Sequence, residues 1–545
     1  MSKVAHYLEE HLSGEVLTTP AIRKYFSTDG GVFTVTPALV VYPRGESDVR
    51  KTARFTWQLA ERGRVIPITA RGLGTDQGSA AVGEGIMMVF PAHMNRILEL
   101  DGKSGDVVVE PGLNYGKLQQ TLHTHGRFLP PFPSSMEFSS IGGAIANNAA
   151  GEKTIKYGAT RDFVKGLRVV LANGEVIETR RLSKRELSKK MGLTTYEGEV
   201  YRALDALIEE DKDTIANSKL NVSKNSAGYA LASVKQKDGS FDLTPLLVGS
   251  QGTLGIVTEA TIKTAPYNPE TTLIAAFFDD LSVAEQVLAE IRKMPDTPSA
   301  MEVVDENLLK FLDAHNPNQL KGIVEKPFHK LIVLIEFDDA NARIQKRMAK
   351  KVTKILSKFQ IPFQVETDEL EKEQLWKIRH SAAAVISHSE GNSKALPIIE
   401  DGIVPAEKFQ QYIHGVYEMF DRYKLQVALW GHAGNANLHM QPFLDLSQIG
   451  DRQKVFRIID DYYTMVIGMG GSTSGEHSDG RLRAPYLRKL YGDAMYGVFQ
   501  KVKHIFDPHG TLNPGVKIDV TLEDIKPLLR HEYSMEHLAD HLPRS

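Results

Sequence analysis

The sequence of 545 residues contains no cysteine. This absence excludes disulfide bonds, cysteine-ligated iron–sulfur clusters and any cofactor attached through a cysteine sulfur, and it fits a reducing compartment. Long apolar runs are also missing. Runs such as residues 85–90 and 331–335 are far shorter than the roughly 20 apolar residues of a membrane-spanning helix. We therefore expect a cytoplasmic protein without a transmembrane helix.

A strong net charge is missing as well. The formal charge is −3 at pH 7, so the chain lacks the basic excess that nucleic-acid phosphates require, and we expect no nucleic-acid partner. Hydrophobic residues make up 42% and charged residues 24% of the chain, which is typical of globular proteins. The length predicts two large domains.

Residues 38–266 have the pattern of an α+β domain. Short β-branched runs bounded by Gly, Pro and Asn indicate strands, for example at residues 65–68, 106–109 and 166–171. A helix is expected at residues 47–62, with Ser47 as its N-cap. The preceding residues, 1–37, are expected to form a polar helical extension.

Residues 267–480 show a different pattern. We expect strands at residues 271–278, 330–337 and 362–366, and helices at residues 281–294 and 340–359. This order is typical of an antiparallel sheet with helices on one face. The last stretch, residues 481–545, is expected to be mainly helical.

Three segments are rich in small residues: 67–78 (PITARGLGTDQG), 133–151 (PSSMEFSSIGGAIANNAAG) and 246–259 (LLVGSQGTLGIVTE). In the second segment, 13 of 19 residues are Gly, Ala, Ser or Asn, which suits a backbone pressed against a flat ligand better than a packed core. Backbone N–H groups of the first segment could bind a phosphate, although a plain polar loop is the alternative. The first segment matches neither the dinucleotide GxGxxG fingerprint nor a P-loop.

Two histidine-containing segments could form a metal site. Residues 430–440 (WGHAGNANLHM) place His432 and His439 across a Gly/Asn turn between two expected strands, where two imidazoles can bind one ion. Structural roles for both histidines are the alternative. Residues 470–481 (GGSTSGEHSDGR) offer Glu476 as a carboxylate ligand and His477 as a free base. A strand would point these two neighbours in opposite directions, so their backbone must be irregular if both serve one site.

These segments, in this order and spacing, resemble the FAD-linked oxidase and dehydrogenase family, whose flavin domain is of the vanillyl-alcohol oxidase (PCMH) type. The resemblance spans residues 42–517 and is nearest to glycolate oxidase subunits, D-lactate dehydrogenases and D-2-hydroxyglutarate dehydrogenases. It implies an α+β fold with a two-part FAD-binding domain at residues 38–266. An antiparallel-sheet cap domain covered by helices would follow at residues 267–480, and residues 481–545 would return to the flavin domain.

The resemblance implies FAD as the cofactor. Carried over position by position, the FAD-binding residues are Arg71, Gly72, Leu73, Gly74, Thr75, Asp76, Ser135, Ser140, Gly142, Gly143, Asn148, Gly151, Tyr157, Gly158, Gly252, Ile256 and Asn513. Leu73 and Asp76 replace a glycine and a serine of the usual family segment. A carboxylate near the pyrophosphate would repel it, so the role of Asp76 is left open.

The resemblance also implies a divalent metal ion (zinc, or manganese or iron). Its ligands would be His432, His439 and Glu476, with His477 as the catalytic base. Asn435 replaces the aspartate that is usual in the family. An amide lacks the charge of a carboxylate, which could weaken a hydrogen bond that supports a ligand.

Arg379 and Lys394 match the positions that hold the substrate carboxylate in the family. A planar guanidinium suits a carboxylate, although an arginine on a helix is otherwise a solvated or paired side chain. The implied reaction oxidises a small D-2-hydroxy acid, with D-lactate as the best guess, to the 2-oxo acid. His477 would take the hydroxyl proton, the metal would activate the hydroxyl, and the α-hydrogen would pass as hydride to flavin N5.

Two other functions stay open. The same scaffold supports a non-redox flavin enzyme of the alkylglycerone-phosphate synthase type, which exchanges an acyl for an alkyl group. The metal set and the Glu476-His477 pair resemble the dehydrogenase branch instead. The third candidate is a metal-stabilised binding protein without turnover.

The electron acceptor is expected to be a quinone or an electron-transfer protein rather than NAD. Residues 340–365 contain no acidic residue, and their seven Lys and Arg surround an apolar stripe. The plain interpretation is a helix that packs on the cap sheet with a solvated face. The alternative is peripheral contact of this face with anionic lipid at the inner side of a membrane. A homodimer is also compatible with the sequence.

Overall fold

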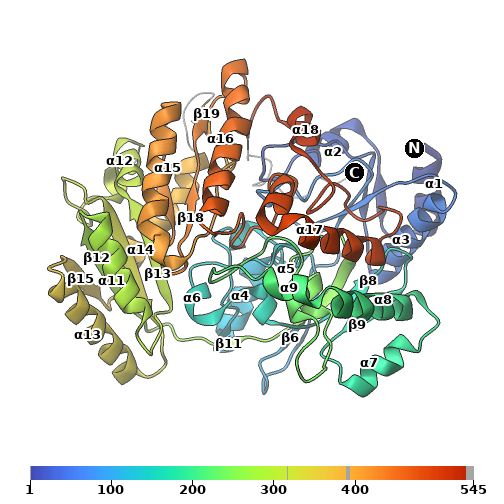
Figure 1. Cartoon of the computed structure of the whole chain (residues 1–545), viewed down its shortest axis with the longest axis horizontal. Coiled ribbons are helices and arrows are strands. Elements are labelled where there is room, and N and C mark those ends of the chain that lie inside the picture. Colours follow the sequence, from blue (N-terminus) through green and yellow to red (C-terminus); the bar gives the residue numbers. More distant parts are fainter. Residues whose placement is uncertain (1, 316, 388–392, 535–545) are drawn as a thin grey trace.

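The computed structural model describes residues 2–315, 317–387 and 393–534. Two parts lie side by side in Figure 1: residues 2–266, the N-terminal lobe, on the right, and residues 267–480, the cap lobe, on the left. The remaining described residues, 481–534, lie mainly with the N-terminal lobe.

The first sheet of the N-terminal lobe has the order β1-β2-β4-β3, in which β2, β4 and β3 run parallel and β1 is antiparallel to β2. Its strands are β1 (Glu15–Leu17), β2 (Leu39–Tyr42), β3 (Ile68–Arg71) and β4 (Ile86–Val89). Helices α1 (Ser2–His11) and α3 (Glu46–Ala60) share its core. Strand β1 lies in the N-terminal extension, so the expectation of helix alone in that segment is wrong.

The second sheet is antiparallel at every pairing and has the order β5-β6-β10-β8-β9. Its strands are β5 (Ile97–Leu100), β6 (Val107–Val109), β8 (Val164–Val170), β9 (Val176–Thr179) and β10 (Ile256–Ile262), and a short pair is formed by β7 (Arg127–Phe128) and β11 (Ala265–Pro266). Helices α4 (Tyr115–Thr124), α5 (Ile141–Asn147) and α8 (Tyr196–Glu210) share its core. The other α-helices described in this lobe are α2 (Pro20–Tyr25), α6 (Thr154–Tyr157), α7 (Lys184–Met191), α9 (Lys212–Asn217) and α10 (Thr244–Leu247). Two separate sheets confirm the two-part first domain.

The sheet of the cap lobe has the order β15-β12-β14-β13-β17-β18 and is antiparallel at every pairing. Its strands are β12 (Thr272–Phe278), β13 (Ala300–Asp305), β14 (Leu331–Phe337), β15 (Phe363–Glu366), β17 (Leu429–His432) and β18 (Asn437–Met440), and β16 (Lys394–Ala395) pairs separately with β19 (Phe443–Leu444). The antiparallel cap sheet is therefore confirmed. Strand β13 was not expected, yet it lies between β14 and β17 and connects the predicted strands to the histidine hairpin.

Helices cover both faces of the cap sheet. One face shares a core with α11 (Leu281–Arg292), α13 (Ala342–Lys358), α15 (Phe409–Tyr423) and α16 (Ile449–Gly468), and the other with α12 (Glu306–His315) and α14 (Glu369–Ser387). The expectation of helices on one face only is wrong. Strand β14 is buried along its whole length, and a strand that is apolar on both sides needs cover on both sides.

Two local boundaries differ from the expectation. Helix α3 begins before Ser47, and the carboxylate of Asp48 accepts the backbone N–H of Arg44 at 3.0 Å, while Ser47 makes no cap. The strand expected at residues 65–68 begins only at Ile68. Pro67 has no N–H to donate, so regular pairing starts after it.

The C-terminal segment closes onto the N-terminal lobe. Helix α17 (Leu487–Phe506) shares the core of the antiparallel sheet, and α18 (Leu522–Ile525) follows it. Between them the chain runs beside β3: the N–H of Ile68 donates to the carbonyl of Thr511 at 2.7 Å, and the N–H of Asn513 donates to Ile68 at 2.9 Å. Further on, the hydroxyl of Tyr533 donates to the carbonyl of Gly30 at 2.8 Å.

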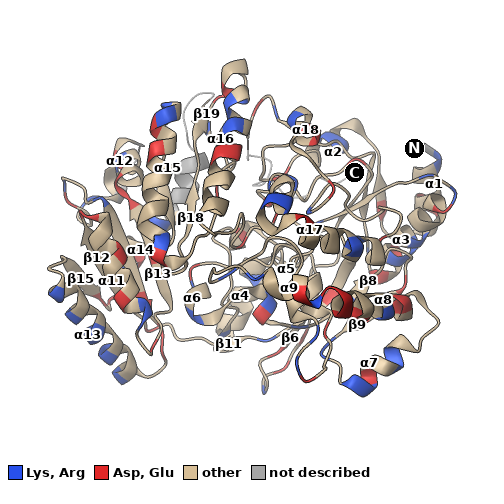
Figure 2. Ribbon diagram, in the orientation of Figure 1, with Lys and Arg blue, Asp and Glu red and all other residues tan. Residues whose placement is uncertain are grey.

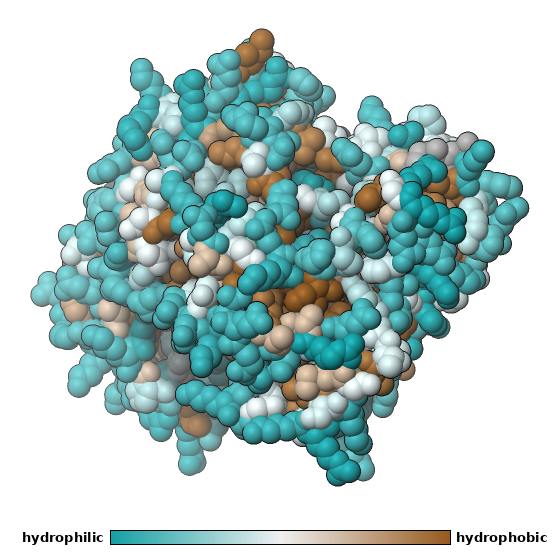
Figure 3. Space-filling view, turned by 45° about the vertical axis from the view of Figure 1, so that its right-hand side comes forward, coloured by the Kyte–Doolittle hydropathy of each residue, from teal (hydrophilic) through white to brown (hydrophobic). Residues whose placement is uncertain are grey.

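Helix α13 confirms the plain interpretation of the basic segment. Met348 and Val352 are buried against the cap sheet, and the Lys and Arg residues appear in blue along the helix in Figure 2. Arg347 and Lys351 lie 3.2 and 3.4 Å from Asp296. Contact of this face with lipid stays a prediction. In the described ranges of the chain, no helix has the length and apolar character of a membrane span. Figure 3 shows another side of the molecule, where hydrophilic residues surround a hydrophobic patch near the middle.

Candidate active site

A cavity of about 740 Å³ lies between the two lobes. The N-terminal lobe lines it with residues 71–77 and with parts of residues 132–152 and 247–257. The C-terminal segment contributes Tyr533. The cap lobe contributes Arg379, His380, Glu400, Trp430, His432, His439, Gln441, Glu476 and His477. The predicted cofactor segments and the predicted metal segments therefore face one common space.

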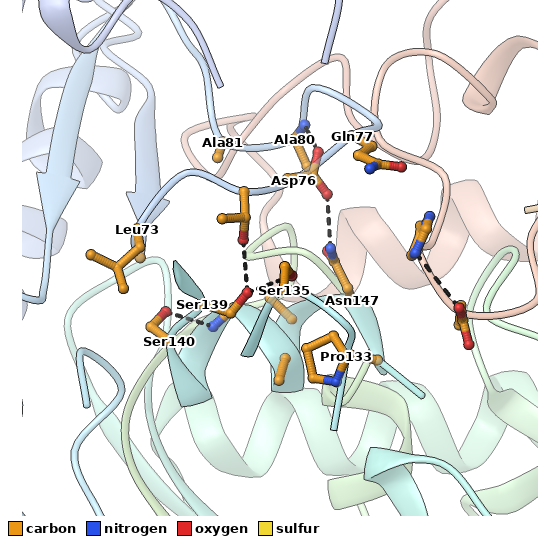
Figure 4. A pocket seen from close by; sticks show the side chains of 18 of the residues that line it. Leu73, Asp76, Gln77, Ala80, Ala81, Pro133, Ser135, Ser139, Ser140 and Asn147 are labelled. Atoms are coloured by element: carbon orange, nitrogen blue, oxygen red, sulfur yellow. Dashed lines mark hydrogen bonds and ion pairs between the residues drawn. The ribbon is translucent and has the colours of Figure 1, made fainter. Parts of the chain in front are cut away.

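The N-terminal-lobe wall is built from small residues, several of which are labelled in Figure 4. A Cβ added to Gly72 would lie 2.0 Å from Ser140 Oγ, so only glycine lets these two loops approach so closely. A Cβ added to Gly143 would meet only Ser140 Oγ, at 3.3 Å. This wall offers the bare backbone on which a flat cofactor can lie, so it fits FAD.

Asp76 has a structural use in this wall. Its carboxylate accepts the backbone N–H of Ala80 at 2.7 Å and the amide of Asn147 at 2.8 Å, and Figure 4 shows the latter contact. The first hydrogen bond lies within the glycine-rich loop, and the second ties this loop to the last residue of helix α5. The role that the sequence left open is thus explained by loop geometry, since the carboxylate is already engaged within the protein.

The three proposed metal ligands converge on one position. Pairing of β17 with β18 brings His432 Nε2 to within 3.4 Å of His439 Nε2. Glu476 Oε1 lies 3.0 Å from His432 Nε2 and 3.1 Å from His439 Nε2. All three side chains are buried and aim their ligand atoms at each other. Two imidazoles and one carboxylate are the three protein ligands of many catalytic metal sites, so the residues fit a divalent metal.

The backbone that carries Glu476 and His477 is irregular, as the sequence required. The carboxylate of Asp401 accepts the N–H of Glu476 at 3.0 Å and the N–H of His477 at 2.7 Å. Asp401 also accepts the hydroxyl of Ser474 at 2.6 Å, and Ser478 has a positive φ of 62°. This bracing lets two neighbouring side chains serve one site.

Sequence reasoning missed two carboxylates behind the histidines. Glu302 Oε1 lies 2.7 Å from His432 Nδ1. Glu400 Oε2 lies 3.3 Å from His439 Nδ1 and 2.6 Å from His477 Nδ1. A carboxylate on the far nitrogen of an imidazole fixes its orientation and tautomer. The available signal was an acidic residue in an otherwise apolar run, namely Glu302 within residues 300–304 and Glu400 directly after residues 395–399.

Two buried cations were also missed. Lys224, from a loop of the N-terminal lobe, makes an ion pair with Glu476 Oε2, although the two residues are 252 positions apart. Arg483 makes an ion pair with Glu400 and donates to the carbonyl of Ser478 at 2.9 Å. Glu476 and Glu400 are thereby each compensated by a cation, which a buried charge requires.

The charges of the cluster shift its pKa values. Burial lowers the pKa of His439 to about 4, and the charges of His432 and His477 add to this effect. Burial alone would raise the pKa of Glu476, but His432 and Lys224 hold it well below its usual value. His439 is therefore a neutral imidazole and Glu476 a carboxylate near neutral pH, the protonation states that a metal binds.

Arg379 lines the cavity as predicted, but its guanidinium is already paired. Nε and Nη2 both lie 2.8 Å from Glu302 Oε2. Lys394 lies in β16 and is not among the residues that line the cavity. The structure therefore brings Arg379 to the cluster, and the predicted role of Lys394 stays a prediction.

Four predicted cofactor residues lie outside the lining of the cavity, namely Asn148, Tyr157, Gly158 and Asn513. Asn148 ends helix α5 with a positive φ, and its side-chain amide oxygen Oδ1 accepts the backbone N–H of Arg161 at 2.9 Å. Tyr157 donates its hydroxyl to Asp338 of the cap lobe at 3.0 Å. Asn513 donates to the carbonyls of Ala80 and Gln251 at 3.0 and 2.9 Å. These residues shape the lobes around the cavity. The other predicted cofactor residues line it.

Contacts across the cavity mouth join the two lobes. His380 Nε2 lies 3.1 Å from Glu152 Oε2. Burial would raise the pKa of Glu152, but the charges of His380, Lys153 and Arg379 hold it at about 2. Lys153 also forms an ion pair with Glu336 of strand β14. Segment 152–157 thus anchors the cap lobe beside the cavity.

The fold and the cavity define a flavin-linked oxidoreductase. Residues 37–180 match the family described as FAD binding domain, and residues 268–516 match FAD linked oxidases, C-terminal domain. The chain belongs to the FAD-linked oxidase family.

Relatives and solved structures agree with this family. The chain is 30% identical to the glycolate oxidase subunit GlcD of Bacillus subtilis over 483 residues, 88% of each chain. It is 30% identical to D-2-hydroxyglutarate dehydrogenase of Escherichia coli over 525 residues, 93% of this chain but only 50% of that one, so it spans about half the length of this relative. The structure of p-cresol methylhydroxylase with bound substrate has a TM-score of 0.69 at 15% identity, with 96% of this chain and 97% of that chain covered. The predicted PCMH-type fold is thereby confirmed.

Proposed function

We propose that this protein is an FAD-dependent dehydrogenase that oxidises a small D-2-hydroxy acid, with D-lactate as the best candidate, to the 2-oxo acid. The observation that carries the proposal is the common cavity, which joins the small-residue wall to His432, His439, Glu476 and His477. The printed names of the relatives support a 2-hydroxy acid. D-lactate lies between glycolate and 2-hydroxyglutarate in size.

FAD on the N-terminal-lobe wall would supply a hydride acceptor at N5, and zinc, manganese or iron held by His432, His439 and Glu476 would supply Lewis-acid polarisation of the substrate hydroxyl. His477 is the proposed base. Its Nδ1 lies 2.6 Å from Glu400 Oε2 without making a hydrogen bond in this geometry, and Nε2 is the nitrogen proposed to accept the hydroxyl proton.

Arg379 is the proposed partner of the substrate carboxylate. Glu302 occupies Nε and one edge of Nη2, which leaves Nη1 and the outer edge of the guanidinium for a second carboxylate. Contact of Lys394 with the substrate stays a prediction.

The test is anaerobic addition of 2-hydroxy acids to the FAD-loaded protein while flavin absorbance is followed. D-lactate, glycolate and D-2-hydroxyglutarate are compared, with L-lactate as the matched control. We expect D-lactate to bleach the flavin fastest and L-lactate to leave it oxidised. Bleaching by none of the acids would overturn the proposed function, and faster bleaching by another D-acid would change the substrate.

The same experiment separates the other candidate functions. A non-redox transferase of the alkylglycerone-phosphate synthase type would not leave reduced flavin. A binding protein without turnover would lose melting temperature on chelation without any change in flavin reduction. Both outcomes differ from the dehydrogenase, for which chelation should slow bleaching.

The proposed acceptor is a quinone or an electron-transfer protein rather than NAD. Reoxidation of the reduced flavin by a soluble quinone analogue, compared with NAD, tests this directly. Peripheral contact through the basic face of α13 is tested by co-sedimentation with anionic and neutral vesicles at low and high salt. Equal recovery in the supernatant with both lipids at low salt would favour a soluble acceptor.

A further inference from the structure

Glu302 is a buried carboxylate in the middle of an apolar strand. It lies in β13, where all residues are buried, and only 1% of it is exposed. A buried charge is costly unless it is paired and hydrogen-bonded. The partners of Glu302 on the cavity side therefore explain why a charged residue stands in this apolar strand.

The two oxygens of Glu302 serve two different groups. Oε1 lies 2.7 Å from Nδ1 of His432, a proposed metal ligand. Oε2 lies 2.8 Å from Nε and from Nη2 of Arg379, the proposed clamp for the substrate carboxylate. One carboxylate thus stands between the metal cluster and the carboxylate clamp and contacts both.

We infer that Glu302 is a positioning residue that couples the two subsites, so that a carboxylate bound at Arg379 strengthens metal binding at His432, His439 and Glu476. The inference rests on the proposed metal site and clamp. The positive charge of Arg379 weakens Glu302 as a hydrogen-bond acceptor. An anion bound to the outer edge of Arg379 offsets part of that charge, so Glu302 becomes a stronger acceptor for the Nδ1 proton of His432. The opposite nitrogen, Nε2, becomes a better metal donor.

The second carboxylate of the cluster lacks such a link. Glu400 contacts His439 and His477, but its cation, Arg483, is fully buried and does not line the cavity. A substrate anion cannot reach Arg483. Glu400 therefore supports its histidines but has no link to the substrate carboxylate, which makes it the matched control for Glu302.

The chemistry of an amide provides the test. A carboxylate can accept hydrogen bonds on both oxygens, whereas a glutamine accepts on one end and donates on the other. In Glu302→Gln the amide oxygen can serve His432 or Arg379, but its NH₂ group then faces the other donor or stabilises the wrong tautomer of His432. The substitution keeps the size of the side chain and breaks the connection between its two partners.

The experiment measures the Kd for Zn²⁺ of the FAD-loaded protein, with and without propionate. Propionate has the carboxylate of the substrate class and no hydroxyl. In the wild type we expect propionate to tighten Zn²⁺ binding about 5-fold, the low end of typical coupling between sites. Glu302→Gln should weaken Zn²⁺ binding about 10- to 100-fold and reduce the propionate effect to less than about 2-fold.

Two variants make the result decisive. Glu400→Gln should weaken Zn²⁺ binding as well but keep the propionate effect, because it leaves Glu302 intact. Glu302→Asp keeps the charge with a shorter reach and should retain part of the effect, and it carries the test if Glu302→Gln does not fold. A full propionate effect in both Glu302 variants, or none in the wild type, would overturn the coupling. A wild type that binds no Zn²⁺ would overturn the proposed metal site itself.

Discussion

The two walls of the cavity differ in the residues that line them: small residues on one side and buried charged residues on the other. On the N-terminal-lobe side, glycines, serines and alanines expose backbone, and the carboxylate of Asp76 accepts a hydrogen bond from its own loop. On the cap side, buried acids, histidines and cations neutralise each other within hydrogen-bonding distance. The first wall recognises a ligand by shape and tolerates changed side chains such as Leu73. The second wall depends on the identity of each residue, because removal of one charge leaves another unpaired.

The largest expected effect comes from breaking the charged wall at a ligand. His432→Ala should lower turnover by about 10³-fold or more, since the metal loses one of three ligands, while FAD remains bound to the opposite wall. Turnover and FAD content per protein are measured together. His414→Ala, an exposed histidine on α15, is the control and should change neither. Undiminished turnover of His432→Ala after thorough chelation would argue against a catalytic metal.

A smaller effect is expected at the proposed base. His477→Ala should slow flavin reduction by about 10²-fold, the typical contribution of a general base, and should change substrate binding much less. Stopped-flow bleaching at several substrate concentrations separates the two constants. If binding collapsed and reduction stayed fast, His477 would be an anchor for the substrate and another group would be the base.

The uncharged wall is broken by bulk rather than by charge. Gly143→Val places methyl groups where a Cβ meets nothing but Ser140 Oγ, so we expect FAD affinity to fall by about 10-fold or more while Zn²⁺ binding is kept. Titration of the apoprotein with FAD gives the affinity. Gly102→Val, at an exposed turn with open space around it, is the matched control. Equal loss of FAD and Zn²⁺ would mean that the two walls do not act separately.

The smallest effect sharpens the comparison within the cap lobe. Burial raises the pKa of Asp305 to about 6, although the N–H groups of Leu308 and Leu429 and the hydroxyl of Tyr417 donate to its carboxylate and offset part of this rise. The stability that this carboxyl adds is fully present below its unfolded pKa near 4 and is lost as the pH rises through about 6. Relative to the wild type, the free energy of unfolding of Asp305→Asn should therefore rise by up to about 3 kcal/mol between pH 4 and pH 8.

Denaturant unfolding at several pH values measures this gain. Asp493→Asn, which changes an exposed aspartate on α17, should show no comparable trend. A stability difference between Asp305→Asn and the wild type that does not change with pH would show that Asp305 is ionised in the fold, like the paired acids of the cavity.

Local patterns predicted the parts of the site that lie close together in the sequence. His432 and His439 share one hairpin, and Glu476 and His477 are neighbours, so their motifs could be found without the fold. The partners of these residues could not, because Lys224 reaches Glu476 across 252 positions and nothing local marks the pair.

The predicted cofactor residues show where composition is less informative. Asn148 and Asn513 stand in segments of the expected composition, yet their amides hydrogen-bond the chain itself. Composition indicates which loops line a cavity but cannot tell a residue that faces the ligand from one that holds the loop. The cap strand β13 was missed for a related reason: Glu302 and Asp305 interrupt an apolar run, and their burial depends on partners from other strands and helices.

Residues that follow the cluster in the sequence reach both strand β3 and the cavity. Strand β3 is flanked by residues 511–513, and Tyr533 lines the cavity while it holds Gly30 near the other end of the chain. A ribosome that has synthesised every histidine and glutamate of the cluster has still not released the segments that border β3 and complete this wall. The wall around β3 is therefore complete only when residues 511–533 are in place, and these residues follow every histidine and glutamate of the cluster in chain order.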